Sequence, residues 1–455
     1  MTRRCIYCGT EKDLSKSDII PDALTSAKII NPNVCRVAHN NKFSDMFENE
    51  VIEKLALITN ELDVKSSKGN HYASYPANVI VDGTEYSTKM STEAELFNQK
   101  IMRSIDGKSI IGPIDKIKNI KGASNENVTE IDINQLEIEK KIVLDLSVFF
   151  GKSMYRLIAK IAFEWYCLNN SVTDKLSEFN PIINFITTGE GKNPVSIVGN
   201  EKIYHYFNQM MDIGSHTLIS YVDEDASVNI LVSLFGIAIY NVRLSDYVIP
   251  QCVNNILFLT INVDAKRSYF KYSTLEEMEK EIKNGFYQMG EFNGLKIMCP
   301  QNFNDVTMTN KMMYYSCDFN KNELNCCNDM DDKLLALIRK QLDQVLNISA
   351  LTVRGLKRFV KEHRKAIDKG IVFNPSGTNK KAVFMFYLIF VCGKSGKKIQ
   401  SFEDLISFVK NKFSGKQIAI SDEICEEMKK EMEAVEEYAR IITQGAVIIE
   451  NMKFN

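Results

Sequence analysis

Two closely spaced pairs of soft metal-binding side chains within the first 39 residues constrain this chain more than any other feature of its sequence. Cys5-x2-Cys8 has the spacing at which two thiolates meet one tetrahedral ion, and Cys35-x3-His39 supplies a second pair. The alternative is that Cys5 and Cys8 are ordinary small residues near a terminus, but two correctly spaced pairs flank one short module. Because a module this short can bury little apolar core, a bound ion would stabilise it directly. We therefore expect Cys5, Cys8, Cys35 and His39 to bind one zinc ion.

The overall composition is that of an ordinary globular chain. Its 455 residues are 45% hydrophobic and 25% charged, with a net charge of -2, so attraction to nucleic acid or a membrane has to come from local patches. The longest apolar run, residues 382–392, is shorter than the roughly 20 residues that cross a bilayer. No apolar run follows the initial Met-Thr-Arg-Arg-Cys, so we expect no secretory signal and no membrane partner. The odd number of cysteines, 11, favours a cytoplasmic location with free or metal-bound thiols.

An α+β fold in four parts is predicted. The parts are a compact zinc-bound module over 1–60, a polar linker and hairpin region over 61–135, a mixed α+β domain of unassigned role over 136–325, and a mostly helical region over 326–455. The first part is expected to end in a helix over 44–58. The second is expected to contain a β-hairpin whose two-residue turn is Asp82-Gly83.

Hydrophobic periodicity places the remaining elements. A buried helix is predicted over 152–168. The middle domain is predicted to contain paired strands over 217–222 and 227–242, a further strand over 255–263 and a charged helix over 274–284. Helical segments are predicted over 329–346, 351–369, 380–392, 402–413 and from 421 onward.

The N-terminal order of motifs resembles the HNH (His-Me finger) endonucleases. The motifs are the Cys5-x2-Cys8 turn, the polar pair Ser17-Asp18 before Ile-Ile-Pro, and the Cys35-x3-His39 pair followed directly by Asn-Asn-Lys. Within the family, the motifs most resemble those of bacterial members whose fold is held by a zinc ion. The resemblance covers residues 5–50 only. It implies that the first module is an HNH-like ββα unit.

The resemblance also implies roles for individual side chains. Asn40 matches the residue that holds the catalytic divalent cation, Mg2+ or Mn2+, and Glu48 matches an acid that completes the shell of that cation. Asn33 matches an asparagine that braces the loop between the strands. His39 stands where the family has a fourth cysteine, at one residue longer spacing. For Glu48 and the nearby Asp45, a solvated acid on the face of a helix is an equally good interpretation.

Two departures from the family pattern bear on catalysis. Asp18 falls where the family places the histidine that acts as general base, and Ser17 falls where it often has a metal-binding acid. An aspartate with an ordinary pKa near about 4 is a weak base at neutral pH, whereas a carboxylate suits Mg2+. Two hypotheses stay open. Either Asp18 and Asn40 hold a cation that activates the attacking water, or Asp18 is a solvated turn residue in a site that has lost its activity.

A second candidate site is a basic amphipathic segment near the C-terminal end of the chain. Residues 354–416 carry 15 Lys/Arg against four Asp/Glu, and cations at the start of this segment share one side of a predicted helix. Such charges neutralise phosphates and release counterions. The residues expected to bind nucleic acid are Arg354, Lys357, Arg358, Lys361 and Lys365. The alternative is a solvated basic face that is balanced by the acidic helix 422–437.

Other features are assigned no catalytic chemistry. Cys326-Cys327 lacks metal-ligand spacing and is interpreted as core or surface thiols, and His216 is interpreted as a core histidine. Gly393-Lys394-Ser395 has the ending of a phosphate-binding loop, but Leu388 stands where the upstream glycine is needed. We therefore predict no use of ATP.

The resemblance implies a cytoplasmic, metal-dependent HNH-type endonuclease that hydrolyses phosphodiester bonds in nucleic acid, with DNA as the first expectation. Small nuclease domains joined to long unrelated regions occur in bacterial anti-phage defence and restriction components. A similar role for this chain is an analogy. The alternative is a catalytically degenerate HNH-fold protein that binds nucleic acid or regulates a partner. A protein partner or a second copy of this chain stays open.

Overall fold

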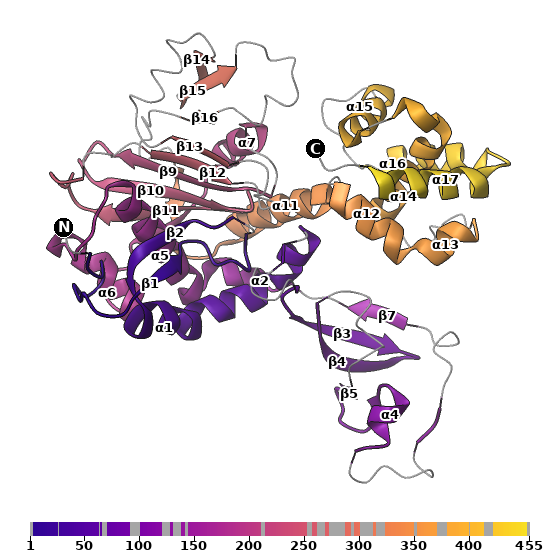
Figure 1. The fold of residues 1–455 in the computed structure, drawn as a ribbon, viewed down its shortest axis with the longest axis horizontal. Coiled ribbons are helices and arrows are strands. Elements are labelled where there is room, and N and C mark those ends of the chain that lie inside the picture. The colour runs from indigo at the N-terminus through magenta and orange to yellow at the C-terminus, as the bar shows by residue number, and fades with distance from the viewer. Residues whose placement is uncertain are drawn as a thin grey trace. The chain divides into compact units, whose positions relative to one another are not determined.

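The protein is a mixture of helices and antiparallel sheets, described here from a computed structural model (Figure 1). It divides into two compact units, Met1–Asn60 with Val64–Leu342, and Glu61–Asp63 with Asp343–Asn455. The cysteine-bearing module and the middle α+β region therefore belong to one unit. The structure describes residues 3–25, 27–62, 64–65, 71–91, 101–120, 128–130, 138–141, 144–210, 214–252, 257–261, 269–272, 287–292, 295–300, 313–314, 324–349, 353–370, 380–399, 401–413 and 422–452.

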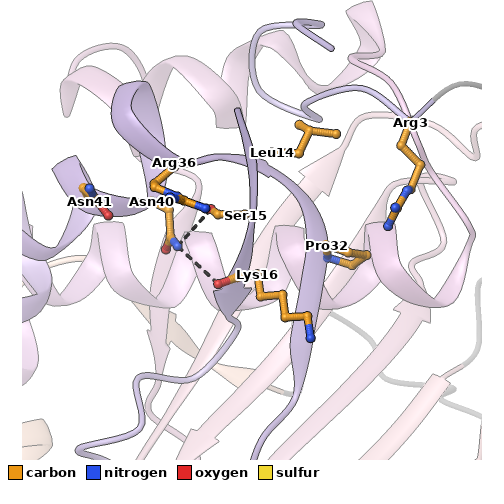
Figure 2. A pocket seen from close by; sticks show the side chains of 8 residues that line it. All are labelled: Arg3, Leu14, Ser15, Lys16, Pro32, Arg36, Asn40 and Asn41. Atoms are coloured by element: carbon orange, nitrogen blue, oxygen red, sulfur yellow. Dashed lines mark hydrogen bonds between the residues drawn. The ribbon is translucent and has the colours of Figure 1, made fainter. Parts of the chain in front are cut away.

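The first unit begins with a turn at the first cysteine pair, a two-stranded hairpin and a long helical run. Strands β1 (Leu14–Asp18) and β2 (Ile30–Cys35) pair antiparallel, with an irregularity in register between Ser15 and Ser17. Figure 2 shows these strands beside the start of the helical run at Asn40 and Asn41. Consecutive elements of that run are η1 (Arg36–Asn40), α1 (Asn41–Phe43), η2 (Ser44–Glu48) and α2 (Asn49–Glu61).

Two turns of this helical run are π-helical. The amide of Asn41 donates to the carbonyl of Arg36, and the amide of Asn49 donates to that of Ser44. Each is a bond to the fifth residue back, whereas an α-helix bonds to the fourth. A π turn therefore holds one residue more than an α turn, and the first of the two lies directly after Cys35.

A five-stranded antiparallel sheet follows, in the order β6-β5-β4-β3-β7. Its central hairpin turns at Asp82 and Gly83, whose φ angles are 46° and 78°. Positive φ at both residues is what a two-residue hairpin turn requires, so the predicted hairpin is confirmed. Ala56 of α2 packs into the core of this sheet. The bounds are β3 (Tyr75–Val81), β4 (Thr84–Met90), β5 (Met102–Ser104), β6 (Ile110–Ile111), the short helix α4 (Ile114–Ile117) and β7 (Ile138–Lys141).

A seven-stranded antiparallel sheet, ordered β13-β12-β9-β10-β11-β8-β17, forms the main sheet of the first unit. Helix α5 (Lys152–Asn169) packs against β8, β10 and β11, and every residue from Met154 to Cys167 is buried. The predicted buried helix is thus confirmed. The strands are β8 (Val195–Val198), β9 (His216–Val222), β10 (Val228–Leu234), β11 (Ala238–Ser245), β12 (Leu257–Ile261), β13 (Tyr269–Tyr272) and β17 (Cys326–Cys327).

The predicted strand over 227–242 is wrong as a single element. Phe235 and Gly236 adopt positive φ angles of 57° and 69° and reverse the chain between β10 and β11. The predicted helix over 274–284 lies outside the described residues. Other elements of this unit are η4 (Leu146–Phe150), η5 (Ser177–Phe179), α6 (Asn180–Thr188), α7 (Glu201–Met210), and the three-stranded sheet of β14 (Tyr287–Phe292), β15 (Leu295–Pro300) and β16 (Met313–Tyr314).

The C-terminal part of the chain is helical, as predicted. Helix α14 is central to the second unit and is buried from Ala382 to Cys392. The predicted helix over 351–369 is broken at His363 into two. No helix in the described parts of the chain is long and apolar enough to cross a membrane. The helices are α11 (Asp332–Ser349), α12 (Val353–Glu362), α13 (Arg364–Asp368), α14 (Lys380–Ser395), η6 (Gly396–Lys398), α15 (Phe402–Lys412), α16 (Asp422–Glu433) and α17 (Tyr438–Asn451).

Candidate metal centre and the adjoining pocket

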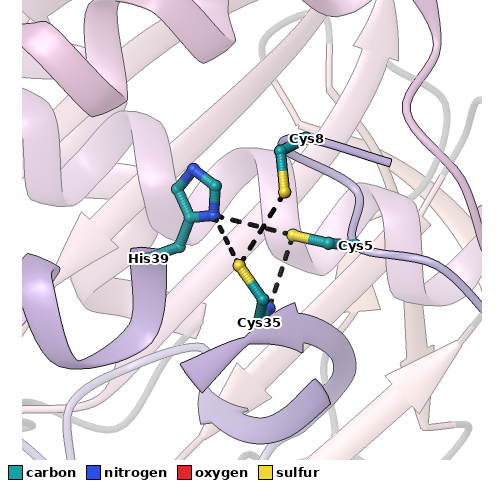
Figure 3. Close-up of side chains that lie close together, drawn as sticks. All are labelled: Cys5, Cys8, Cys35 and His39. Atoms are coloured by element: carbon teal, nitrogen blue, oxygen red, sulfur yellow. Dashed lines mark hydrogen bonds between the residues drawn. The ribbon is translucent and has the colours of Figure 1, made fainter. Parts of the chain in front are cut away.

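The four predicted ligands come together at one point (Figure 3). The ligand atoms of Cys5, Cys8, Cys35 and His39 all lie within 4.8 Å of one another. Cys8 Sγ is 3.8 Å from Cys35 Sγ, and Cys5 Sγ is 3.7 Å from His39 Nδ1. Zinc with Zn–S bonds of about 2.3 Å in tetrahedral geometry separates two sulfurs by about 3.8 Å. The group can therefore hold a metal ion, and three sulfurs with one imidazole is a donor set typical of structural zinc.

The turns on either side of the group explain its geometry. Gly9, with φ of 73°, closes the first turn by donating its amide to the carbonyl of Cys5 at 2.7 Å. Cys35 ends β2, and the π turn that follows brings His39 back to it although three residues separate them. Cys35 Sγ and His39 Nδ1 lie 2.9 Å apart, so this pair has to open slightly around an ion.

Burial shifts the pKa values of the metal-binding side chains Cys5, Cys35 and His39. It raises the pKa of the Cys5 thiol and raises the pKa of Cys35 to about 12, while it lowers the pKa of His39 to about 4. The imidazole is therefore neutral at physiological pH and ready to bind a metal, whereas the thiols must lose their protons as the metal binds. The ring of Tyr7 stacks on His39 at a centroid distance of 5.0 Å and fixes its orientation.

Asn40 follows the last ligand and points at β1. Its side-chain amide donates to Ser15 Oγ at 3.1 Å and to the Lys16 carbonyl at 3.2 Å, as Figure 2 shows. These bonds tie the start of the helical run to the strand. Asn40 also lines a pocket of about 570 Å³, together with Arg3, Leu14, Ser15, Lys16, Pro32, Arg36 and Asn41.

Three exposed cations give this pocket its chemistry. Arg3 precedes the first cysteine, Lys16 lies in β1, and Arg36 opens the helical run. Arg36 has a loose ion pair with Asp13 at 3.8 Å. Cationic side chains around a concave surface favour an anionic ligand. No motif in the sequence singles out these residues, although each lies within four positions of a predicted site residue.

Asp18 is at the end of β1 and is half-buried. Its neighbour Ser17 is fully buried. The residues that line the pocket do not include Asp18. The backbone carbonyl of Asp18 accepts a hydrogen bond of 2.5 Å from Lys160 of α5. Convergence of the Asp18 and Asn40 side chains on one cation stays a prediction.

Glu48 lies in a buried ion pair. Only 7% of the residue is exposed, and its Oε1 is 2.9 Å from Nζ of Lys160, which is itself 1% exposed. A second carboxyl, Glu164, is completely buried with Oε2 4.0 Å from the same Nζ, and it accepts a hydrogen bond of 3.0 Å from Tyr7. The solvated interpretation of Glu48 is therefore wrong, and its role as a cation ligand stays a prediction.

The pKa values of this buried group follow from its surroundings. Burial raises the pKa of Glu164 to about 7, although Lys160 and the hydroxyls of Ser17 and Tyr7 act to lower it. Burial acts to lower the pKa of Lys160, but the negative charges of Glu164 and Glu48 outweigh it and the pKa is raised. Lys160 is therefore an ammonium group with Glu48 as its closest counter-ion.

Asn33 and Asn31 attach β2 to the segment around α5. The Asn33 amide nitrogen donates to the Val172 carbonyl at 3.3 Å, and that of Asn31 donates to the Glu164 carbonyl at 2.9 Å. The residue expected to brace the inter-strand loop thus holds β2 against the chain after α5. The hairpin is fixed by long-range bonds that the sequence pattern did not indicate.

The basic segment of the second unit is partly engaged in structural contacts. Lys361 and Lys365 are exposed, whereas Lys357 and Arg358 are half-buried. Nζ of Lys357 donates to the Met452 carbonyl at 2.5 Å. Arg354 lies in the first turn of α12. The exposed Lys361 and Lys365 are thus the members of this set best placed for phosphate contact.

The acidic helix α16 forms ion pairs with cations other than the five predicted nucleic-acid-binding residues. Glu431 pairs with Lys394 at 3.2 Å and with Lys412, and Tyr387 donates to it at 2.7 Å. Basic residues of α14 and α15 are therefore balanced by α16 within the second unit. Arg364, next to the basic face of α12, pairs instead with Glu450 of α17 at 2.8 Å.

The core interpretation of His216 is confirmed. The residue is completely buried, its Nε2 is 2.9 Å from the Leu24 carbonyl, and its Nδ1 accepts the Phe235 amide at 3.3 Å. Burial lowers the pKa of His216 to about 4, which leaves it neutral. Cys326 and Cys327 are half-buried thiols in β17.

Comparison with known proteins adds no family to this picture. No family model, no curated protein and no solved structure matches the chain. The resemblance of residues 5–50 to the HNH endonucleases therefore rests on the motifs themselves, and the fold and side-chain geometry have to carry any functional argument.

Proposed function

We propose that this protein is a metal-dependent endonuclease of the HNH type, which hydrolyses phosphodiester bonds of nucleic acid beside its zinc group. The observation that carries the proposal is the cationic pocket of about 570 Å³ that adjoins the metal-ligand group. A nucleic-acid strand presents one negative charge per phosphate, and clustered Arg and Lys side chains bind such a backbone.

Each residue of the site has a chemical role in this proposal. Zinc on Cys5, Cys8, Cys35 and His39 would hold the first turn, the hairpin and the helical run together. Arg3, Lys16 and Arg36 would bind phosphate oxygens. Asp18 and Asn40 would hold a divalent cation, which stabilises negative charge on a phosphate and lowers the pKa of water.

The contacts of Asn40 support this assignment in part. Its hydrogen bonds to Ser15 and Lys16 leave from the amide nitrogen, so the amide oxygen is the atom that would bind a cation. Asp18 stands two residues after Lys16 in β1, and Lys16 lines the pocket. A carboxylate and an amide oxygen suit Mg2+, which keeps several water ligands.

A second function, binding of nucleic acid without cleavage, has its own support. The pocket lining contains no histidine, and Glu48 forms an ion pair with Lys160. A site that lacks a general base and one of its acids would retain a cationic surface for phosphate. In this alternative the same pocket binds nucleic acid and the divalent cation is not needed.

Plasmid nicking with Mg2+ or Mn2+, measured beside binding of the same DNA, separates the two functions. The endonuclease proposal expects cleavage by the wild type, loss of cleavage in Asp18→Ala and Asn40→Ala, and retained zinc in both variants. Asp45→Ala is the matched control, because Asp45 is an exposed acid of the same module. Binding without cleavage of either DNA or RNA by the wild type would support the second function.

A further inference from the structure

We propose that Lys160 is a positioning residue for the candidate nuclease site, and that α5 is the scaffold on which this site is assembled. The inference rests on the proposed function. It assigns a role to the middle region of the chain. Lys160 lies more than a hundred residues beyond the motifs and contacts them from the centre of α5.

The ammonium group of Lys160 meets three oxygen atoms. It donates hydrogen bonds to the Asp18 carbonyl at 2.5 Å and to the Ile19 carbonyl at 3.4 Å, and it forms an ion pair with Glu48 Oε1 at 2.9 Å. Two of them are consecutive backbone carbonyls where β1 ends. One side chain therefore fixes the backbone that carries the Asp18 carboxylate, without touching the pocket.

Burial makes this attachment a specific one. Lys160 is 1% exposed, and a buried ammonium is strongly destabilising unless charged and polar partners surround it. Glu48 supplies the opposite charge from η2. The same charge thus joins α5 to the end of β1 and to the helical run, the two elements that carry Asp18 and Asn40.

Glu164, one helical turn beyond Lys160, holds the other side of the module. Its carboxyl accepts from Tyr7, which lies between the first two metal ligands, and its backbone carbonyl accepts from Asn31 of β2. Two successive turns of α5 therefore fix the cysteine turn, β2 and the end of β1. A small shift of reacting groups lowers catalytic rates steeply, by up to about a hundredfold per ångström.

Paired replacement of the ion pair separates positioning from stability. Lys160→Met alone leaves Glu48 charged and buried, which is expected to unfold the module, whereas Lys160→Met with Glu48→Gln removes both charges together. Glu48→Gln alone, measured beside the double variant, separates loss of the Glu48 carboxylate from loss of Lys160. The matched control is Arg156→Met. Arg156 lies one turn earlier in α5 and is also buried. It donates to the Ile186 carbonyl at 2.7 Å rather than to β1, although its guanidinium lies over the ring of Phe47 in η2.

Three measurements are made on the full-length chain with zinc bound. They are the steady-state cleavage constants, the bound zinc, and hydrogen exchange of the segment 14–24. We expect the double variant to keep its zinc and to lose about ten- to a hundredfold in kcat with KM changed by less than about twofold. Exchange at the Ile19 amide, which bonds to the Ile29 carbonyl, should become faster. Arg156→Met should lower the melting temperature and leave kcat and the exchange of this segment unchanged.

Each other outcome contradicts the inference. A double variant that cleaves like an active wild type, or one whose KM rises while kcat is unchanged, overturns the positioning role and leaves the proposed function intact. An equal loss of kcat in Arg156→Met shows a general effect of instability and overturns it as well. A wild type that is inert on DNA and RNA overturns the proposed function and this inference together.

Discussion

The hydroxyl of Tyr7 donates a hydrogen bond of 3.0 Å to Glu164 Oε1, across 157 positions of sequence. Tyr7 lies between the metal ligands Cys5 and Cys8, and Glu164 lies in the most buried helix of the first unit. The bond therefore joins the turn that binds the metal to the core of the main sheet. The cysteine-bearing module is a part of its unit, fixed by buried polar contacts, and is not an appended finger.

The buried Glu164 predicts a pH dependence of stability. Its pKa is raised by burial to about 7, above the unfolded value of about 4.3. A group with a raised pKa stabilises the fold fully below its unfolded pKa, and this contribution is lost as pH rises through the folded pKa. Relative to the wild type, Glu164→Gln should gain stability between pH 5 and pH 8, by an amount on the order of 3 kcal/mol.

Denaturant unfolding at several pH values, followed by Trp165 fluorescence with zinc in excess, measures this difference. Trp165 is the only tryptophan of the chain and lies next to Glu164. Glu178→Gln, an acid outside the buried group, provides the control and should follow the wild type. A constant difference between Glu164→Gln and the wild type from pH 5 to pH 8 would show that Glu164 titrates normally.

Zinc should be stoichiometric and should require Cys35. Cys35 contacts two other ligand atoms, Cys8 Sγ and His39 Nδ1. Cys35→Ser is therefore expected to remove the bound zinc and to destabilise the first unit by more than about 4 kcal/mol. Elemental analysis and thermal unfolding measure both effects. Cys327→Ser, a half-buried thiol outside the group, should retain one zinc per chain. Purified wild type without zinc contradicts the prediction.

Lys361 and Lys365 should contribute to nucleic-acid binding in a salt-dependent way. Both are exposed, whereas Lys357 is held by the Met452 carbonyl. Their replacement by Glu should weaken binding and lower the slope of log K against log salt by up to about two units, about one per lost phosphate contact. Fluorescence anisotropy from 50 to 300 mM salt, about the range in which such contacts are screened, measures the slope.

The matched control changes the net charge equally at residues outside α12 and α13. Lys398→Glu with Lys430→Glu alters two other exposed cations of the second unit. An equal change of slope in both double variants would indicate a non-specific effect of net charge. An unchanged slope in Lys361→Glu with Lys365→Glu would contradict the prediction and leave the interpretation of this segment as a solvated basic face.

Gly445 should be intolerant of any side chain. A Cβ atom at Gly445 would lie 1.9 Å from the Ile389 carbonyl, and one at Gly393 would lie 1.9 Å from the Ile441 carbonyl. Helices α14 and α17 thus cross with their backbones in contact, and a methyl group would force them apart. Gly445→Ala is expected to destabilise the second unit by about 3 kcal/mol or more. Circular dichroism during unfolding measures this, with the exposed Val447→Ala as a control that changes little.

Local signals in the sequence predicted the local features. The Cys5-x2-Cys8 and Cys35-x3-His39 spacings identified a group whose atoms do meet. Asp82-Gly83 identified a two-residue turn, and the apolar spacing from residue 152 identified α5. Each of these rests on residues that are near one another in the chain, where the geometry of a turn or a helical period constrains the outcome.

Long-range polar contacts were not predictable in the same way. Lys160 and Glu164 stand in a helix whose apolar positions indicated burial, but no pattern tells that two charged residues in it are buried as well. Their partners Asp18 and Tyr7 lie 142 and 157 positions away. The cations of the pocket were missed for a related reason, because Arg3, Lys16 and Arg36 become neighbours only when the hairpin and the helical run pack together. The break at Phe235-Gly236 was missed because the apolar run continues through it.

Asp18→His is the sharpest test of what the site can do. Asp18 ends β1, and the Lys160 bond to its backbone carbonyl does not depend on its side chain. An imidazole there would have a pKa near about 6.5 and could accept a proton from water near neutral pH. If the site is an active nuclease with a substituted base, Asp18→His should preserve or raise cleavage at pH 7 to 8, with activity falling below about pH 6 as the imidazole protonates. Asp18→Asn, which keeps the shape and removes both charge and basicity, should be inactive and serves as the matched control. The endonuclease proposal fails if the wild type and Asp18→His are both inert on DNA and RNA with Mg2+ and with Mn2+, while both retain zinc and bind nucleic acid.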